Sequence, residues 1–405
     1  MKKSKIVKQI FTQLGSAAVI ASTAVTYSYA ESTQISDEVE SRLSIIESRL
    51  DQEDSRVTIN GFFSASFITH DDETAVTDNW GGVTDKNDFG ALSNIGIQMM
   101  FDINDEMTMV AQLVARGEES WDLEAEWAFI AYEATDALTL RFGRQKAPLY
   151  LLSEYIEVGY AMPWITAPDE VYGITGDSTY DGIGALYSFD IGDWDTTIQA
   201  LYANNSFDTT ALGTIDLNDF VTLSITGESE NWTLRLGYSV VSGDIEELKV
   251  AGVTAIEAND DTDISYASAG AKFDNGDWLV MSEIVSLAID GPLADADAAY
   301  FMVGYRFGNV MPHFTWSQMK NGDPGDRDYL DDIAGPGAGA AMDAQFVEEQ
   351  TTYTAGVRWD FMAGTAAKFE VSHVTDFNDT KGQFQAGTRS EDSINIVKFS
   401  LDSVF

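Results

Sequence analysis

The chain has 405 residues, no cysteine and a formal net charge of −43 at pH 7. It therefore has no disulfide and no thiolate metal ligand, and it lacks the basic surface that binding to nucleic-acid phosphates requires. After the first thirty residues, no window holds about eighteen consecutive apolar residues, so the sequence predicts no membrane-spanning helix there.

The first thirty residues are typical of a secretory signal peptide. Four lysines precede a weakly apolar stretch that ends near Val25, and Ser28 and Ala30 supply small residues before a cleavage site. We predict cleavage after Ala30 and export. A membrane anchor is the alternative, but Ser, Thr, Gln and Gly interrupt the apolar stretch. Cleavage would remove four lysines and no acid, so the exported chain is more acidic still.

Residues 31–56 predict a short periplasmic coiled-coil helix. Apolar side chains recur there at intervals of four and three residues, which is the spacing of a coiled-coil seam. The seam residues are Val39, Leu43, Ile46 and Leu50. Because a helix of this length is marginally stable alone in water, we expect copies of it to bundle. A single amphipathic helix lying on the rest of the protein, or a disordered segment, is the alternative.

From Val57 the apolar period changes to two. In segment 89–103, Ile95, Ile97 and Met99 share one face, opposite Asn94 and Gln98. In segment 122–134, the predicted apolar face is Leu123, Ala125, Trp127, Phe129 and Ala131, opposite Glu124 and Glu126. Alternation over about ten residues is typical of a transmembrane β-strand.

Sixteen such segments follow one another over residues 57–405. The first begins at Val57, and the others are 89–103, 107–116, 122–134, 137–145, 180–190, 193–203, 217–227, 231–242, 262–274, 277–288, 297–307, 309–320, 347–361, 364–376 and 392–405. Their connections alternate between short turns and mostly longer loops. The long loops are 70–88, 117–121, 146–179, 204–216, 243–261, 289–296, 321–346 and 377–391. This alternation predicts an all-β, 16-stranded antiparallel outer-membrane barrel with both ends in the periplasm.

Aromatic residues gather at the short-turn end of the predicted strands. They are Trp194, Trp232 and Trp278 just after short turns, and Phe189, Phe273, Phe307 and Trp359 just before them. Amphipathic rings at one level are expected at a membrane interface. In a soluble β-sandwich, which is the alternative, the same positions would be polar hairpin ends.

With the apolar face of each strand turned outward, the predicted lumen wall is charged. Its bases are Arg116, Arg141, Arg235, Lys272, Arg306, Arg358, Lys368 and Lys398. Its acids are Asp102, Glu124, Glu126, Asp190, Glu283, Asp360, Glu370 and Asp402. The excess acid lies in the outer loops. In one of them, Asp323, Asp326, Asp328, Asp331 and Asp332 suggest divalent-cation bridging, although they lack the spacing of a calcium-binding loop. A solvated surface is the simpler interpretation.

The longest connection within the barrel, 146–179, is rich in aromatic residues. A loop of this length inside a compact domain is usually functional. We interpret it as folding into the lumen to form the pore constriction, with Lys146, Glu154, Glu157, Asp169 and Glu170 facing Arg141 on the wall. Acids opposite bases would create a transverse field that screens solutes by charge and size. A solvent-facing loop is the alternative.

The sequence gives little support for catalysis. His70, His313 and His373 are the only histidines. His313 shares a strand face with Ser317, but four residues of a strand separate them by roughly 13 Å, too far for a hydrogen-bonded catalytic pair. We therefore expect no enzymatic activity, and nothing in the sequence calls for a cofactor.

Taken together, these features resemble those of the Gram-negative trimeric porins, and in particular gammaproteobacterial porins with an N-terminal coiled-coil extension. The resemblance covers the exported chain. It is most specific from Gly143-Arg144-Gln145 through Ser153-Glu154-Tyr155, Gly159-Tyr160 and Pro163-Trp164 to Glu170-Val171-Tyr172. The terminal Phe405, in phase with Leu401, Phe399 and Val397, resembles the aromatic end that the family's assembly machinery recognises.

This resemblance implies a homotrimeric outer-membrane porin surrounded by outer-membrane lipid and lipopolysaccharide. Small hydrophilic solutes and ions would diffuse passively through a water-filled pore that the third loop narrows. A plugged barrel that serves as an adhesin or envelope tether is the alternative function. The acidic outer loops favour a weak preference for cations, while the inward arginines favour small anions, so the sign of the selectivity stays open.

Overall fold

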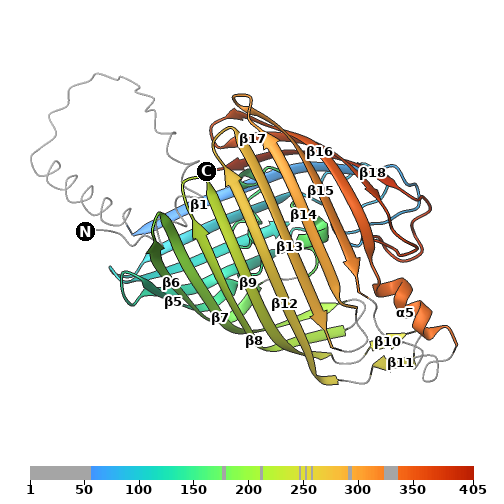
Figure 1. Ribbon diagram of the computed structural model, residues 1–405, viewed down its shortest axis with the longest axis horizontal. Coiled ribbons are helices and arrows are strands. Elements are labelled where there is room, and N and C mark those ends of the chain that lie inside the picture. Colours follow the sequence, from blue (N-terminus) through green and yellow to red (C-terminus); the bar gives the residue numbers. More distant parts are fainter. Residues whose placement is uncertain are drawn as a thin grey trace, which may run out of the picture.

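The computed structural model describes residues 56–175, 179–209, 213–245, 248–250, 253–256, 259–290, 294–322 and 336–405. Sixteen antiparallel strands form one closed barrel (Figure 1). The predicted signal peptide and the coiled-coil residues Val39, Leu43, Ile46 and Leu50 lie outside the described residues. Within them, no helix is long and apolar enough to cross a bilayer.

The prediction of sixteen strands is confirmed. The first eight are β1 (Val57–His70), β2 (Asn94–Asp102), β3 (Met107–Arg116), β4 (Leu123–Glu133), β5 (Leu138–Lys146), β6 (Thr179–Ile191), β7 (Trp194–Thr209) and β8 (Gly213–Glu228). The other eight are β9 (Trp232–Ile245), β12 (Asn259–Asp274), β13 (Trp278–Ile289), β14 (Ala296–Tyr305), β15 (Val310–Asn321), β16 (Glu349–Met362), β17 (Thr365–Thr375) and β18 (Ile394–Val404). Each strand pairs with its neighbours in sequence order, and β1 pairs with β18 to close the ring.

One predicted loop is wrong. Residues 204–216 were expected as a long connection, but β7 continues to Thr209 and β8 begins at Gly213. A bulge between Ala203 and Asn205 shifts the register, and the ladder then runs on to Thr209 paired with Gly213. The pairing beyond the bulge involves polar residues such as Asn205 and Asp208, so hydrophobic alternation could not detect it.

The two ends of the barrel differ. Short turns join the strands at the end where the chain terminates, and long loops lie at the other end, with α5 (Ala338–Phe346) and the small hairpin of β10 (Leu248–Val250) and β11 (Val253–Ile256) (Figure 1). At the short-turn end, aromatic rings pair across strands. Trp232 lies 4.8 Å from Phe273, and Trp278 lies 4.8 Å from Tyr305, both between ring centroids.

The last residue helps to close the barrel. The Phe405 amide donates to the Gly61 carbonyl at 3.0 Å, and the Gly61 amide donates back to Phe405 at 2.8 Å. The Phe405 ring occupies the space beside the Gly61 Cα, where any Cβ would lie within 2.3 Å of a ring atom. A larger residue at position 61 would therefore make the exposed Phe405 ring shift from this position.

A second correction concerns β4. A bulge opposite Gln112 and Leu113 reverses the side-chain alternation, so Trp127 and Phe129 are buried in the lumen and do not share the outward face of Leu123. The outward residues after the bulge are Ala128, Ile130 and Tyr132. Because both faces are apolar there, the sequence pattern could not locate the one-residue shift.

The long loops form a layer over the outer end. Segment 71–93 packs against segment 376–393, with Val83 and Phe384 in a common apolar cluster. The Asp72 carboxylate accepts backbone hydrogen bonds from Thr74, Ser390 and Glu391 at 2.9, 2.9 and 3.0 Å. These bonds outweigh desolvation of the carboxyl, which by itself raises the pKa, and hold the Asp72 pKa well below its usual range. The two segments are thereby tied together.

Candidate functional site in the barrel lumen

The connection between β5 and β6 lies inside the barrel. Its backbone amides at Leu151 and Ile165 donate to Glu283 of β13 and Glu370 of β17, each at 2.8 Å. Both carboxylates are 1% exposed and face inward. We call residues 147–175 the lumen loop; it includes the turn η1 (Gly159–Ala161) and the short helix α3 (Asp169–Tyr172).

One face of the lumen loop packs in an apolar core. Leu149, Leu152 and Val171 of the loop are at most 2% exposed, as are Met281 and Met302 of the wall. The inward faces of β13 and β14 are therefore largely apolar, whereas that of β15 also holds His313, Thr315 and Ser317. This differs from the expectation that the apolar face of each strand would turn outward to the lipid.

Polar anchors hold the same face of the loop. Glu283 accepts the Leu151 amide and also the Tyr172 hydroxyl at 2.7 Å. Arg235 of β9 donates to the Pro148 carbonyl, and the Ser268 hydroxyl donates to the Leu149 carbonyl at 2.7 Å. Because unpaired buried polar groups are costly, these bonds fix the start of the loop against β9, β12 and β13.

The middle of the loop is anchored to β16 and β17. Lys368 donates to the carbonyls of Gly159 and Trp164, both at 2.6 Å, and pairs with Asp402 at 3.0 Å. Arg358 donates to the carbonyls of Tyr160 and Met162, both at 2.7 Å. Lys368 and Arg358 of the wall therefore both donate hydrogen bonds to the backbone of the loop.

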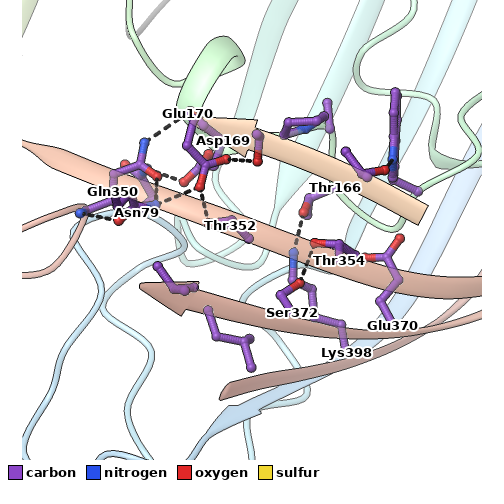
Figure 2. Close-up of a pocket in the computed structure, with 18 of the residues that line it drawn as sticks. Asn79, Thr166, Asp169, Glu170, Gln350, Thr352, Thr354, Glu370, Ser372 and Lys398 are labelled. Atoms are coloured by element: carbon purple, nitrogen blue, oxygen red, sulfur yellow. Dashed lines mark hydrogen bonds between the residues drawn. The ribbon is translucent and has the colours of Figure 1, made fainter. Parts of the chain in front are cut away.

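Figure 2 shows where α3 meets the wall. Glu170, 3% exposed, accepts hydrogen bonds from Ser317 at 2.7 Å, from Gln350 at 2.8 Å and from Thr352. Asp169 accepts one from Asn79 of the outer loop 71–93. Glu170 thus contacts β15 and β16, a different part of the wall from Arg141. The sequence analysis did not identify the neutral residues that bind these two acids, because the alternation of a strand shows which face a side chain is on but not what it contacts. These residues are Ser317, Gln350, Thr352 and Asn79.

The other side of the loop faces a charged wall. Arg116 pairs with Glu126 and, at 2.8 Å, with Glu157 of the loop, while Lys146 lies 2.8 Å from Glu126 and 3.0 Å from Glu157. Arg116 also contacts Glu124 at 3.4 Å. The two bases therefore neutralise the buried Glu126 and the half-buried Glu157 where the loop leaves β5.

Arg141 lies five residues before Lys146 on β5, nearer the short-turn end of the strand. Its side chain is buried, and the neighbouring Leu140 and Phe142 face outward. Its guanidinium is 5.1 Å from the centre of the Phe129 ring and 3.5 Å from Glu154, whose side chain is 40% exposed. Of the loop acids assigned to the constriction, only Glu154 contacts Arg141.

The loop separates cavities of different charge. The outer vestibule has a volume of about 700 Å³. Its charged lining residues are Arg116, Lys146, Glu118, Glu119, Glu124, Glu126, Glu157 and Asp169. The inner chamber, of about 140 Å³, is lined by Arg141, Arg235, Lys272, Glu154 and Glu228 among its charged residues. Tyr150 and Ser153 line both cavities, so the boundary between them lies at the start of the loop.

A third cavity, of about 310 Å³, lies on the same side of the loop as the inner chamber, toward the short turns. Arg306 and Arg358 line it, and each pairs with an aspartate, Asp274 and Asp360, at 2.7 Å. Lys272 lines both this cavity and the inner chamber. The inner side of the loop therefore has slightly more bases than acids, whereas the vestibule is strongly acidic.

Two loop acids titrate differently. Burial alone would raise the pKa of Glu157, but Lys146 and Arg116 outweigh it and lower the pKa to about 2. For Asp169, burial raises the pKa to about 6, and nearby Glu170 adds to the rise against the Asn79 hydrogen bond. Glu157 is therefore charged at any physiological pH, whereas Asp169 changes its charge near neutrality.

The aspartates of loop 321–346 and the three histidines were the other candidate site residues. The five aspartates of loop 321–346 lie outside the described residues, and among those described, no three acidic or histidine residues are arranged to hold a metal ion. His70 contacts the Val83 carbonyl at 3.2 Å and His373 contacts Asn395 at 2.9 Å. His313 lies 3.7 Å from Glu370.

Solved porins have the same architecture. The chain superimposes on Salmonella typhi OmpF in complex with daunomycin with a TM-score of 0.57 at 13% identity, over 86% of this chain and 97% of that one. An anion-selective porin from Comamonas acidovorans gives a TM-score of 0.54 at 11% identity, covering 86% and 99%. The trimer form of OmpT from Vibrio cholerae gives 0.52 at 13%, also covering 86% and 99%.

At these identities, the structural similarity establishes the fold alone. No curated protein sequence matches this chain. The sequence model of the Gram-negative porins, however, matches residues 15–392, which is nearly the whole chain. The chain therefore belongs to the Gram-negative porin family, and it is an outer-membrane channel for passive diffusion.

Proposed function

We propose that the narrowest part of this channel lies where the lumen loop passes β4 and β5. The observation that supports the proposal is that Tyr150 and Ser153 line both the outer vestibule and the inner chamber. Beside them, Glu154 faces Arg141, and Glu157 faces Lys146. Opposite charges across this gap would orient dipolar solutes and screen ions by charge and size. In this proposal Asp169 lines the outer vestibule, and Glu170 ties the loop to β15 and β16. Neither of them faces Arg141.

The absence of cysteine allows a direct test. Glu154→Cys would introduce a single thiol at the proposed narrowing, and Lys320→Cys would introduce one at an exposed position near the outer end of β15. After reaction with a bulky methanethiosulfonate reagent, we expect the single-channel conductance of the Glu154→Cys protein to fall by about half or more, and that of Lys320→Cys to stay unchanged. Equal effects at the two positions would place the constriction elsewhere.

The proposal contains no catalytic step, because passage through a pore needs no bond to be made or broken. Conductance also distinguishes the channel from a plugged barrel acting as an adhesin or tether. The purified parent protein should conduct potassium chloride in a planar bilayer. If the bilayer stays silent while the folded barrel is present, the channel proposal fails.

We further propose a homotrimer in which residues 31–56 of three copies bundle in the periplasm. The apolar seam at Val39, Leu43, Ile46 and Leu50 supports it, together with the trimer form recorded for the Vibrio cholerae protein. Replacing Leu43 and Ile46 with Asp should abolish cross-links between helices while the barrels remain in the membrane. A parent protein without such cross-links would contradict the bundle.

A further inference from the structure

Two outer loops form one unit that meets the lumen loop. We call segments 71–93 and 376–393 together the outer cap. The Asp78 amide of the first segment donates to the Gln383 carbonyl of the second at 3.1 Å. Both segments also pack against β1, β17 and β18 through the apolar cluster that includes Phe384. The outer cap is therefore anchored to the wall on one side of the barrel.

At the other edge of the outer cap, two side-chain amides hold Asp169 of α3. The Asn79 amide donates to the Asp169 carboxylate, and the Gln383 amide donates to the Asp169 backbone carbonyl at 3.1 Å. Gln350 of β16 fixes the Gln383 amide in turn, because its own amide donates to the Gln383 side-chain oxygen at 2.8 Å. Figure 2 shows Asn79 and Gln350 beside Asp169. The outer cap thus contacts both the side chain and the backbone of one acid.

The backbone of the outer cap turns sharply next to this contact. Trp80, Gly81 and Gly82 have φ angles of 59°, 67° and 78°. Glycine adopts this left-handed conformation readily, but a bulky residue such as tryptophan adopts it at a cost in free energy. The turn places Asn79 on Asp169 and the centre of the Trp80 ring 4.7 Å from the Lys398 Nζ. The strained residue therefore directly follows the one that contacts the acid.

The charge of Asp169 acts on ions that enter the channel, because this residue lines the outer vestibule. Burial is the main cause that raises the Asp169 pKa to about 6, and the Asn79 hydrogen bond opposes the rise. A hydrogen bond donated to a carboxylate favours its charged form, so Asn79 keeps Asp169 ionised down to a lower pH. The charged groups around Asp169 are Glu118, Glu170, Glu348 and Lys398.

We propose that the outer cap sets the ion selectivity of the vestibule, with Asn79 and Gln383 as positioning residues that hold the Asp169 carboxylate in place. A displacement of the outer loops would then change selectivity without any change in the wall of the barrel. This inference rests on the proposed function only in that the barrel must conduct. It does not depend on a narrowing beside Arg141.

The test is the pH dependence of the reversal potential in a potassium chloride gradient, measured on the purified full-length protein in a planar bilayer. All proteins in the series carry Glu118→Gln, so that Asp169 gives the main step in cation preference. Asn79→Leu keeps the size of the side chain and removes the donor. We expect the midpoint of the step to rise by about one pH unit, because the neutral carboxyl is then favoured at higher pH.

Further variants separate positioning from a general loosening of the loops. Asn79→Ala also lacks the donor and should give the same shift as Asn79→Leu. Gln383→Leu should shift the midpoint upward by less, because Gln383 contacts the carbonyl and not the carboxylate of Asp169. Gln385→Leu is the matched control, since it changes an exposed amide of the same outer cap, and it should leave the midpoint unchanged.

Asp169→Asn tests whether Asn79 acts through this acid. The variant should lack the step, and adding Asn79→Leu to it should change nothing more. Equal midpoints in Asn79→Leu and Gln385→Leu would overturn the proposal, and so would an effect of Asn79→Leu that persists beside Asp169→Asn. A protein that conducts but shows these results contradicts this inference alone, whereas a protein that does not conduct contradicts the channel itself.

Discussion

The two faces of the lumen loop are held in different ways. Toward β13 to β15, the loop packs through apolar side chains and through buried hydrogen bonds, such as those of Glu283 with Leu151 and Tyr172. Toward β3 to β5, it meets the wall through ion pairs, as between Glu157 and Arg116. We call the first the dry face, because Leu149, Leu152 and Val171 of the loop are almost fully buried there, although the third cavity reaches its edge at Met281 and Met311. The second face borders the outer vestibule.

This difference indicates that one face of the loop holds it in place and the other contacts solutes. Apolar packing and satisfied buried hydrogen bonds depend little on salt, so they can hold the loop in place under any ionic condition. Charges on the other face remain available to solutes, and their effect is weakened by salt. A loop fixed only by ion pairs would move as the medium changed, whereas this one is also held by apolar packing and by the buried carboxylate of Glu283.

The largest expected effect comes from breaking the dry face. Glu283→Leu would leave the Leu151 amide buried without an acceptor and would leave the Tyr172 hydroxyl only its long 3.4 Å contact with the Tyr300 hydroxyl, at about 1–3 kcal/mol for each buried group that loses its acceptor. We expect the docked loop to lose about 2–5 kcal/mol, so the single-channel conductance should rise and fluctuate, and the loop should become sensitive to protease in detergent.

Glu283→Gln is the matched control, because it keeps an acceptor oxygen and nearly the same volume. Its conductance should stay close to that of the parent protein. A Glu283→Leu channel with unchanged conductance and protease resistance would show that the apolar packing alone holds the loop.

The dry face also marks the limit of what could be predicted from the sequence. Alternation located the sixteen strands, because most outward positions of a membrane barrel must be apolar. It could not show that Met281, Met302 and Met311 point inward, since an inward position covered by a loop follows the rule of a protein core. The same ambiguity hid the bulge that turns Trp127 into the lumen.

The charged face was easier to anticipate, but only in part. Arg141 had to face inward because Leu140 and Phe142 flank it on a strand. No periodicity constrains a loop, so the sequence could not show that Glu157 pairs with Arg116 and Lys146 or that Glu170 contacts Ser317. These contacts depend on the path of the loop across the barrel, which is set by distant residues such as Glu283 and Lys368.

A smaller effect is expected from the charged face. Arg141→Ala removes a positive charge beside the half-exposed Glu154 and should raise the permeability of cations relative to anions. A partly exposed pair contributes at most about 1 kcal/mol, so the change in the permeability ratio should not exceed about fivefold. The reversal potential in a salt gradient measures it.

The double change Glu154→Gln and Glu157→Gln should shift the reversal potential in the opposite direction. It also leaves Arg116 and Lys146 without one of their partners, so the conductance must be checked for a displaced loop. If neither Arg141→Ala nor the double change moves the reversal potential, the charges beside the loop do not set selectivity.

We expect the smallest change in ion selectivity from a change of pH. Between pH 8 and pH 5, Asp169 takes up a proton, because burial raises its pKa to about 6. Glu118, in the same vestibule, is an exposed residue, but the protein around its carboxyl and the neighbouring Glu119 raise its pKa to about 7. Glu157 stays ionised throughout, since its pKa is about 2. The vestibule therefore loses negative charge as the pH falls.

The sign of the change follows directly. Above pH 7 both Glu118 and Asp169 are ionised and attract cations, and below pH 6 both are mostly neutral, so the preference for cations should weaken as the pH falls. Asp169→Asn should remove the step near pH 6 and leave the step near pH 7, and Glu118→Gln should do the reverse. A reversal potential that varies identically with pH in the parent and both variants would show that neither residue is responsible. Because most of the vestibule acids stay charged, the shift should be smaller than that of Arg141→Ala, and low salt should enlarge it.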